Sequence, residues 1–253
     1  MILITGGAGY IGSHLVLKLL KQNENVIVYD NLINSTLRNL EKINKTIRKK
    51  STFYFVEGDV RDVSRLEKLF KRFNITKVIH LAALKSIPNS FKDDLEYLSV
   101  NEAGSEVVFN LAVKYSVQTI IFSSSASVYA SVPKLKYSED DLVCGTSSPY
   151  AKSKLTSEQH LHSLKKKDMS IDIIILRYFN PVGLDGSGIL IEENLQGCTL
   201  FAALMDKIST KGYFEIYGRD YMTMDGTAIR DYIHVNDLVD VHLLLMNQKV
   251  LDQ

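Results

Sequence analysis

The sequence is short of several residue types, and each shortage excludes a class of protein. Its two cysteines, Cys144 and Cys198, stand far apart and form neither a CxxC metal pair nor a disulfide framework. Only four prolines and fourteen glycines occur among 253 residues, which argues against disorder or low complexity. We therefore expect one compact globular chain, without a bound metal, in a reducing compartment.

Charge of one sign and long apolar runs are also lacking. The thirty basic and twenty-nine acidic residues leave a net charge of +1, so no global field favours nucleic acid or an anionic membrane. No apolar run is long enough to span a bilayer, and the first apolar segment lacks the basic region that begins a signal peptide. We expect a cytoplasmic protein with a small-molecule partner, without nucleic-acid or membrane partners.

Apolar residues, at 45% of the chain, are arranged as alternating strand and helix patterns. Six β-α units in succession predict a parallel, doubly wound α/β sheet. Three- and four-residue apolar spacing predicts helices over Ser64–Phe73, Leu95–Tyr115 and Pro149–Lys165. Beyond Arg177 the periodicity weakens into loops, so we expect a dinucleotide-binding domain over 1–177 and an incomplete substrate-binding part over 178–253, packed on it. The expected strands are Ile2–Thr5, Asn25–Asp30, Thr52–Val56, Lys77–Leu81, Thr119–Ser123 and Ile171–Leu176.

A glycine cluster lies between the first strand and a helix that starts near Tyr10. Gly7, Gly9 and Gly12 satisfy the pattern G-x-G-x-x-G, and Gly6 gives a second register of the same kind. Glycine permits a tight turn and lets the backbone approach a pyrophosphate, while the helix N-terminus presents free N–H groups to the anion. The pattern predicts a Rossmann-type dinucleotide site.

Two carboxylates at strand ends extend that site. Asp30 follows the turn by about 20 residues, where a carboxylate accepts hydrogen bonds from the adenosine ribose and repels a 2′-phosphate. This favours NAD over NADP; the alternative is a helix-capping role for Asp30. Asp59 ends the third strand and either meets the adenine amino group or is a plain turn residue.

A second constellation follows the fifth strand, whose hydroxyl-rich end falls at the carboxyl edge of the sheet. Tyr150 and Lys154 are four apart on a predicted helix and so share one face. One Tyr-x-x-x-Lys is expected by chance in a chain of this composition, so a structural role for each residue stays open. A neighbouring ammonium and a positive nicotinamide ring would both lower the pKa of the Tyr150 phenol, which would let it act as a base. Ser125 could then bind the same substrate oxygen.

These motifs together resemble the extended short-chain dehydrogenase/reductase family and, within it, the UDP-glucose 4-epimerases. The matching segments cover nearly the whole chain in the family's order, and the last two segments point to the epimerases in particular. The matching segments are Thr5–His14, Asp30–Leu32 with Asn34-Ser35, Val78–Lys85, Phe122–Tyr129, Ser148–Lys154, Leu176–Gly183, and Arg230–Val235 with Asp225–Thr227.

The resemblance implies oxidation of a sugar C4 hydroxyl by tightly held NAD, rotation of the 4-keto sugar, and return of the hydride to its other face. The resemblance implies that Tyr150 is the base, that Ser125 hydrogen-bonds the sugar 4-oxygen, and that Lys154 holds the nicotinamide ribose. The expected cofactor-binding residues are Gly6, Gly9, Tyr10, Ile11, Gly12, Asp30, Asn31, Asn34, Ser35, Asp59, Val60, Leu81, Ala82, Lys85, Asn101, Tyr150, Lys154 and Tyr178. The expected substrate-binding residues are Lys85, Ser125, Tyr150, Phe179, Asn180, Tyr217 and Arg230, although Arg230 could instead pair with Asp231 or another acid.

The chain departs from the family pattern after Gly197. Cys198-Thr199-Leu200 replaces an Asn-Asn-Leu, and the chain ends at Gln253 where relatives continue with further substrate contacts. We therefore expect tight NAD binding, weak UDP-sugar binding and slow epimerisation, and we keep a truncated NAD-binding paralogue with a binding or regulatory role as the alternative. A nucleotide-sugar 4,6-dehydratase is disfavoured, because Ala126 and Ser127 stand where it needs an acid and a carboxylate base. Apolar residues beyond one stripe on 95–115 and 149–165 predict a homodimer.

Overall fold

The computed structural model describes residues 1–47, 51–129, 134, 136–144, 148–192, 199–216 and 218–247. Six parallel strands form one sheet in the order β3-β2-β1-β4-β5-β6, which confirms the predicted Rossmann-type topology. The strand order reverses between β1 and β4, the point at which such sheets bind their ligands. The strands are β1 (Ile2–Thr5), β2 (Val26–Asp30), β3 (Phe53–Glu57), β4 (Lys77–His80), β5 (Thr119–Ser125) and β6 (Asp172–Tyr178).

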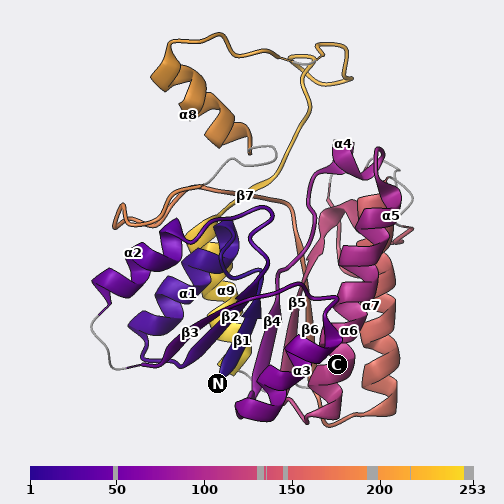
Figure 1. Ribbon diagram of the computed structural model, residues 1–253. Coiled ribbons are helices and arrows are strands. Elements are labelled where there is room, and N and C mark those ends of the chain that lie inside the picture. The colour runs from indigo at the N-terminus through magenta and orange to yellow at the C-terminus, as the bar shows by residue number, and fades with distance from the viewer. Residues whose placement is uncertain are drawn as a thin grey trace.

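Helices cover both faces of this sheet (Figure 1). Alternate residues of β1 show the division: Ile2 and Ile4 enter one core cluster, and Leu3 enters the other. The first cluster takes in α1 (Tyr10–Lys21), α2 (Arg38–Thr46) and α9 (Val235–Asn247). The second takes in α3 (Val63–Arg72), α6 (Gly104–Lys114) and α7 (Pro149–Lys167).

Most predicted boundaries are correct within one or two residues, but the segment 95–115 is less regular than expected. It comprises α5 (Asp94–Tyr97), a π-helical stretch η1 (Leu98–Ala103) and then α6. A short helix α4 (Ile87–Ser90) precedes it, and a single turn η2 (Ala126–Val128) follows β5. Apolar spacing does not separate α from π geometry, so the sequence alone did not indicate the π-helical stretch.

Beyond residue 177 the expectation of loops was incomplete. Two short strands, β7 (Asn180–Val182) and β8 (Tyr232–His234), pair in parallel, and α8 (Leu200–Thr210) has no buried residue. In Figure 1, α8 lies apart from the sheet, whereas α9 packs beside α1. Val239, Leu243 and Met246 of α9 join the same core as β1. The division at residue 177 stays a prediction, and α9 belongs to the packed body of the fold.

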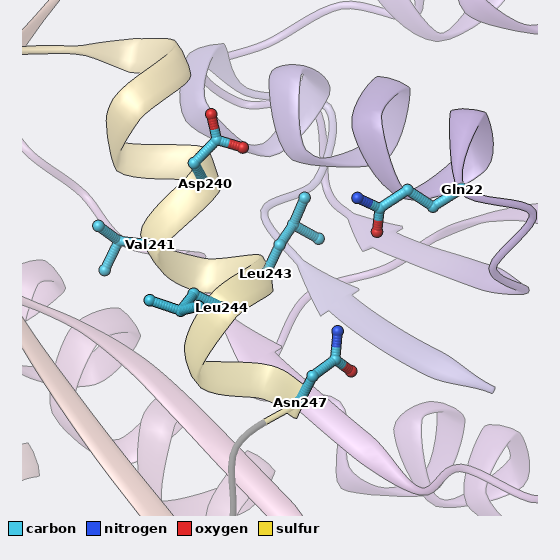
Figure 2. Close-up of a pocket in the computed structure, with 6 residues that line it drawn as sticks. All are labelled: Gln22, Asp240, Val241, Leu243, Leu244 and Asn247. Carbon is cyan, nitrogen blue, oxygen red and sulfur yellow. The ribbon is translucent and has the colours of Figure 1, made fainter.

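A depression of about 440 Å³ lies between the end of α1 and α9 (Figure 2). Gln22, which follows α1, and Asn247, at the end of α9, both line it. Lys77 at the start of β4 donates to Asn247, so the depression lies at the amino edge of the sheet. Ligands of open α/β sheets bind at the opposite edge, and we assign no site here. Within the described part of the chain, no helix is long and apolar enough to cross a membrane.

Candidate active site

The glycine turn after β1 is the first part of the carboxyl edge. Gly6 has φ +73°, and a Cβ there would lie 2.6 Å from the Ala82 nitrogen in the segment after β4. A Cβ at Gly12 would collide with the carbonyl oxygen of Gly6, so α1 can pack this close to the turn only with glycine there. No side chain caps the first turn of α1, which leaves its amides to face an anion. Leu81 and Ala82, predicted cofactor residues, flank the same turn.

Asp30 lies at the end of β2, beside the turn. Its side chain is 8% exposed, and it accepts hydrogen bonds from the Ala8 nitrogen at 3.0 Å, the Leu32 nitrogen at 2.9 Å and Ser35 Oγ at 3.1 Å. A carboxylate has about four acceptor positions, so about one is left for a ribose hydroxyl. Nearby in the sequence, Asn34 Oδ1 is buried and has no hydrogen-bond partner among the described residues. That acceptor and the open glycine turn fit a bound dinucleotide.

Asp59, after β3, is more fully engaged. Its two carboxylate oxygens accept from the main chain and guanidinium of Arg61 at 2.8–2.9 Å and from Asn31 Nδ2 at 3.0 Å. The Arg61 hydrogen bonds lower the pKa of Asp59 to about 2. With four hydrogen bonds already made, the carboxylate is saturated, which favours the turn role that the sequence left open.

Asn101 lies behind the site. It is 1% exposed, and its amide bonds the Leu84 nitrogen at 2.7 Å, the Leu84 carbonyl at 2.9 Å and Ser153 Oγ at 3.3 Å. It thereby ties the segment after β4 to α7. Ser105 donates to the Asn101 carbonyl and also bonds the buried His80 ring at 2.8 Å. These contacts give Asn101 a supporting position, with its amide already satisfied, whereas Lys85 on the same segment is exposed.

Ser125, Tyr150 and Lys154 converge where β5 meets α7. Ser148 Oγ accepts from the Ala151 nitrogen at 3.1 Å and Pro149 follows it, so α7 begins as predicted. Lys154 Nζ donates to the Ser123 carbonyl at 2.7 Å and lies 5.9 Å from the centroid of the Tyr150 ring. Ser125 acts to lower the pKa of the Tyr150 phenol, so these two side chains lie close together. The structure brings the predicted catalytic trio together.

In the protein without its cofactor, the pKa values of Tyr150 and Lys154 differ from the sequence-based expectation. Burial raises the pKa of the Tyr150 phenol, although the Ser125 hydrogen bond opposes the shift. Burial also lowers the pKa of the Lys154 ammonium to about 7, while the Glu158 carboxylate acts in the other direction. Loss of water around Lys154 therefore weakens the positive charge that was expected to depress the pKa of Tyr150.

Glu158, which the sequence reasoning missed, lies one turn beyond Lys154 and is 1% exposed. The Arg177 guanidinium donates hydrogen bonds to both carboxylate oxygens of Glu158, at 3.1 and 2.8 Å. Ser124 Oγ also donates to this carboxylate. Arg177 and Ser124 are paired in the β5–β6 register, so this ion pair fastens α7 to two strands. Its i+4 spacing from Lys154 was the available signal.

Tyr178 ends β6 opposite Ser125. Its hydroxyl bonds His242 Nε2 of α9 at 2.6 Å, and burial raises its pKa. The sequence reasoning named Tyr178 as a cofactor residue but not His242, which is 64 positions away.

The predicted substrate residues after β6 are more open. Phe179 is 43% exposed, and Asn180 Nδ2 donates to the Asp231 carbonyl at 2.7 Å, across the β7–β8 pair. Arg230 is exposed and, within the described ranges, makes no ion pair with Asp231 or another acid. Tyr217 and Cys198 lie outside the described residues.

Comparison with known proteins agrees with this geometry. The model of the NAD dependent epimerase/dehydratase family matches residues 2–252, and the chain belongs to that family. Among its relatives are UDP-glucose 4-epimerases of Yersinia enterocolitica, 43% identical, and Haemophilus influenzae, 41% identical; each match covers 96% of this chain and 72% of the relative.

Solved structures give the same result. A UDP-glucose 4-epimerase from Bifidobacterium longum in complex with NAD+ and UDP superposes with a TM-score of 0.89 at 39% identity, over 97% of this chain and 73% of that one. One from Stenotrophomonas maltophila, with bound NAD and formylated UDP-arabinopyranose, gives a TM-score of 0.89 at 36% identity, over 96% and 72%. The resemblance stated from the sequence is confirmed.

Proposed function

We propose that this protein is an NAD-dependent epimerase acting at C4 of a UDP-hexose, interconverting UDP-galactose and UDP-glucose through a transient 4-keto sugar. The observation that carries the proposal is the convergence of Ser125, Tyr150 and Lys154 at the carboxyl edge of a Rossmann sheet that also carries the glycine turn. Relatives at 36–43% identity that carry this activity in their names support it, and so do neighbours solved with NAD and either UDP or a UDP-sugar.

The cofactor would be held along the carboxyl edge between β1 and β4. The α1 amides would face its pyrophosphate, Asp30 would accept from the adenosine ribose, and the unpartnered Asn34 Oδ1 would gain a donor. When bound there, NAD supplies a reversible acceptor for the C4 hydride. Asp30→Ala is expected to weaken NAD binding, measured by calorimetry; equal or better binding of NADP by the unmutated protein would contradict the choice of NAD.

Side chains of this protein would take up and return the proton of the sugar 4-hydroxyl. Ser125 Oγ hydrogen-bonds the 4-oxygen, and Tyr150 takes up the proton in one direction and returns it in the other. The Lys154 ammonium lies close enough to favour the phenolate when it is charged. Because the oxidised sugar is reduced again in the same site, the reaction has no net redox change.

The dehydratase alternative lacks its acid and base. η2 places Ala126 and Ser127 after the serine strand, and Ser127 Oγ is bound to Ser125 Oγ at 2.9 Å. Glu158, a carboxylate beneath the same strand, is held by Arg177 and has no freedom to act as a base. These contacts favour epimerisation.

The assembly and location remain proposals. Leu95 on α5 is 75% exposed, and Phe91, at the end of α4, is 64% exposed. Burying them against a second copy supports a homodimer. We propose a cytoplasmic homodimer without nucleic-acid or membrane partners; a concentration-independent monomer mass in light scattering would reject the dimer.

The function is tested with purified protein and UDP-galactose, with UDP-glucose formation coupled to a UDP-glucose dehydrogenase. We expect this protein to epimerise UDP-galactose without any second nucleotide as its own co-substrate. NAD released on denaturation, together with no interconversion, would instead support a non-catalytic NAD-binding protein.

A further inference from the structure

A buried histidine of α9 reaches the edge of the candidate site. His242 is 0% exposed, and its Nδ1 lies 2.8 Å from the Leu238 carbonyl, one turn earlier in the helix. A carbonyl oxygen only accepts, so Nδ1 carries the proton. Burial lowers the pKa of His242, which keeps the ring neutral. Its Nε2 is therefore an unprotonated acceptor.

The hydroxyl of Tyr178 supplies the proton for that acceptor. The two atoms are 2.6 Å apart, and the ring centroids are 5.7 Å apart. Because the hydroxyl proton is given to His242, the Tyr178 oxygen can only accept from other groups.

Strand β5 lies between Tyr178 and the proposed catalytic lysine. Ser125 of β5 is paired with Tyr178 in the sheet register, and the Ser123 carbonyl of the same strand accepts from Lys154 Nζ. Tyr178 stands opposite Ser125 in the sheet, and the nearby Tyr150 acts to raise the pKa of Tyr178. A displacement of the Tyr178 ring would therefore disturb Ser125 and Tyr150, the residues proposed to bind the 4-oxygen and transfer its proton.

We propose that His242 is a positioning residue, which accepts the Tyr178 hydroxyl proton and thereby fixes the Tyr178 ring beside Ser125 and Tyr150 with its oxygen presented as an acceptor. This inference rests on the proposed epimerase function. His242 touches neither substrate nor the reacting atoms, and it acts through Tyr178.

Four variants separate positioning from simple core filling. His242→Phe keeps an aromatic ring but removes the acceptor, and should lower kcat about tenfold with little change in KM for UDP-galactose, since misplaced groups near the reacting atoms cost rate. His242→Gln offers an amide oxygen at similar reach and should recover most of that loss. In a Tyr178→Phe background, His242→Phe should lower kcat by less than about twofold more, because the two residues act as one unit.

Leu243→Ala is the matched control. Leu243 is the next residue of α9, and its side chain packs in the core cluster with α1, away from Tyr178. It should lower the melting temperature and leave the kcat of the folded enzyme unchanged. If Leu243→Ala lowers kcat as much as His242→Phe, or if His242→Phe and Tyr178→Phe are additive, the positioning role is overturned.

A spectroscopic readout tests the same contact without turnover. In the holoenzyme with ¹⁵N-labelled histidine, His242 should show a protonated Nδ1 and an unprotonated Nε2, and Tyr178→Phe should shift the Nε2 resonance. Protonation of both nitrogens, or no shift in the variant, would contradict the proposal. If the unmutated enzyme does not interconvert UDP-sugars but the resonance shifts as expected, the proposed function has failed while the His242 contact stands.

Discussion

The two sides of the candidate site are built differently. Ser125, Tyr150 and Lys154 lie on long elements of the main sheet and its covering helix, and Lys154 is 3% exposed. The residues expected to contact the UDP-sugar lie on the short β7–β8 pair and next to it, where Phe179 and Arg230 are exposed. The difference indicates that the proposed proton-transfer groups are held by the core, whereas the proposed nucleotide-sugar contacts lie at the surface. Substitutions on the first side should reduce kcat or stability, and those on the second should raise KM.

The largest expected effect is on the support of the chemical side. Glu158→Ala leaves the Arg177 guanidinium without its carboxylate partner. The Arg177 side chain is only 16% exposed. Removing one partner of a buried ion pair typically costs about 3–5 kcal/mol, so the free energy of unfolding in urea should fall by that order. Glu67→Ala, which removes ion pairs to the exposed Lys71 and Lys114, is the control and should cost less than about 1 kcal/mol. Equal losses in the two variants would show that the Glu158 pair gives the site no special support.

The next effect is on the chemistry itself. Tyr150→Phe removes the proton-transfer group and should lower kcat at least about a hundredfold with NAD still bound. Tyr115→Phe, which removes a hydroxyl bound to Glu67 on the far side of the fold, should leave kcat unchanged. Near-normal turnover in Tyr150→Phe would remove Tyr150 from the mechanism.

A pH dependence of stability follows from the buried lysine. The pKa of Lys154 in the fold is about 7, below its ordinary value of 10.5. Below about pH 7 both folded and unfolded chains carry the ammonium, and between about 7 and 10 only the unfolded chain keeps it. Unfolding then takes up a proton, so the free energy of unfolding should rise with pH by up to about 1.4 kcal/mol per unit in this window. The rise should be absent in Lys154→Met; a parallel pH profile for the two proteins would show that Lys154 is charged in the fold.

The smallest effect is expected on the nucleotide-sugar side. Arg230→Ala should raise KM for UDP-galactose about tenfold, because one charge-assisted hydrogen bond contributes about 1.5–3 kcal/mol, and it should change kcat less than Tyr150→Phe does. Arg219→Ala, at another exposed arginine of the same region, is the matched control. If Arg230→Ala instead abolishes kcat and leaves KM unchanged, the division between the two sides is wrong.

The sequence predicted the sheet well because its signals are local. Each strand is a short β-branched run, Ser148 and Pro149 mark the start of α7, and the glycine turn lies where its spacing required. The proximity of Ser125, Tyr150 and Lys154 could also be expected from one helical turn and one strand end, while their catalytic roles stay a prediction.

The remaining features are not marked by any motif or periodicity in the sequence. His242 meets Tyr178 across 64 positions, and nothing in the periodicity of α9 marks that residue as different from its core neighbours. The direction of the Tyr150 pKa shift could not be obtained from the nearby lysine alone, because burial of both side chains outweighs their proximity. Arg61, two residues later, donates to the Asp59 carboxylate, and the motif spacing did not predict this contact either.

In the proposed reaction, the C4 hydrogen leaves the sugar and returns to it within one site. This proposal is tested most directly by supplying UDP-galactose deuterated at C4 and analysing the UDP-glucose formed by mass spectrometry and NMR. Epimerisation through a transient 4-keto sugar predicts that the deuterium is retained at C4 of the product, with none in solvent and no net reduction of NAD. Loss of the label, or accumulation of a 4-keto-6-deoxy sugar, would contradict it.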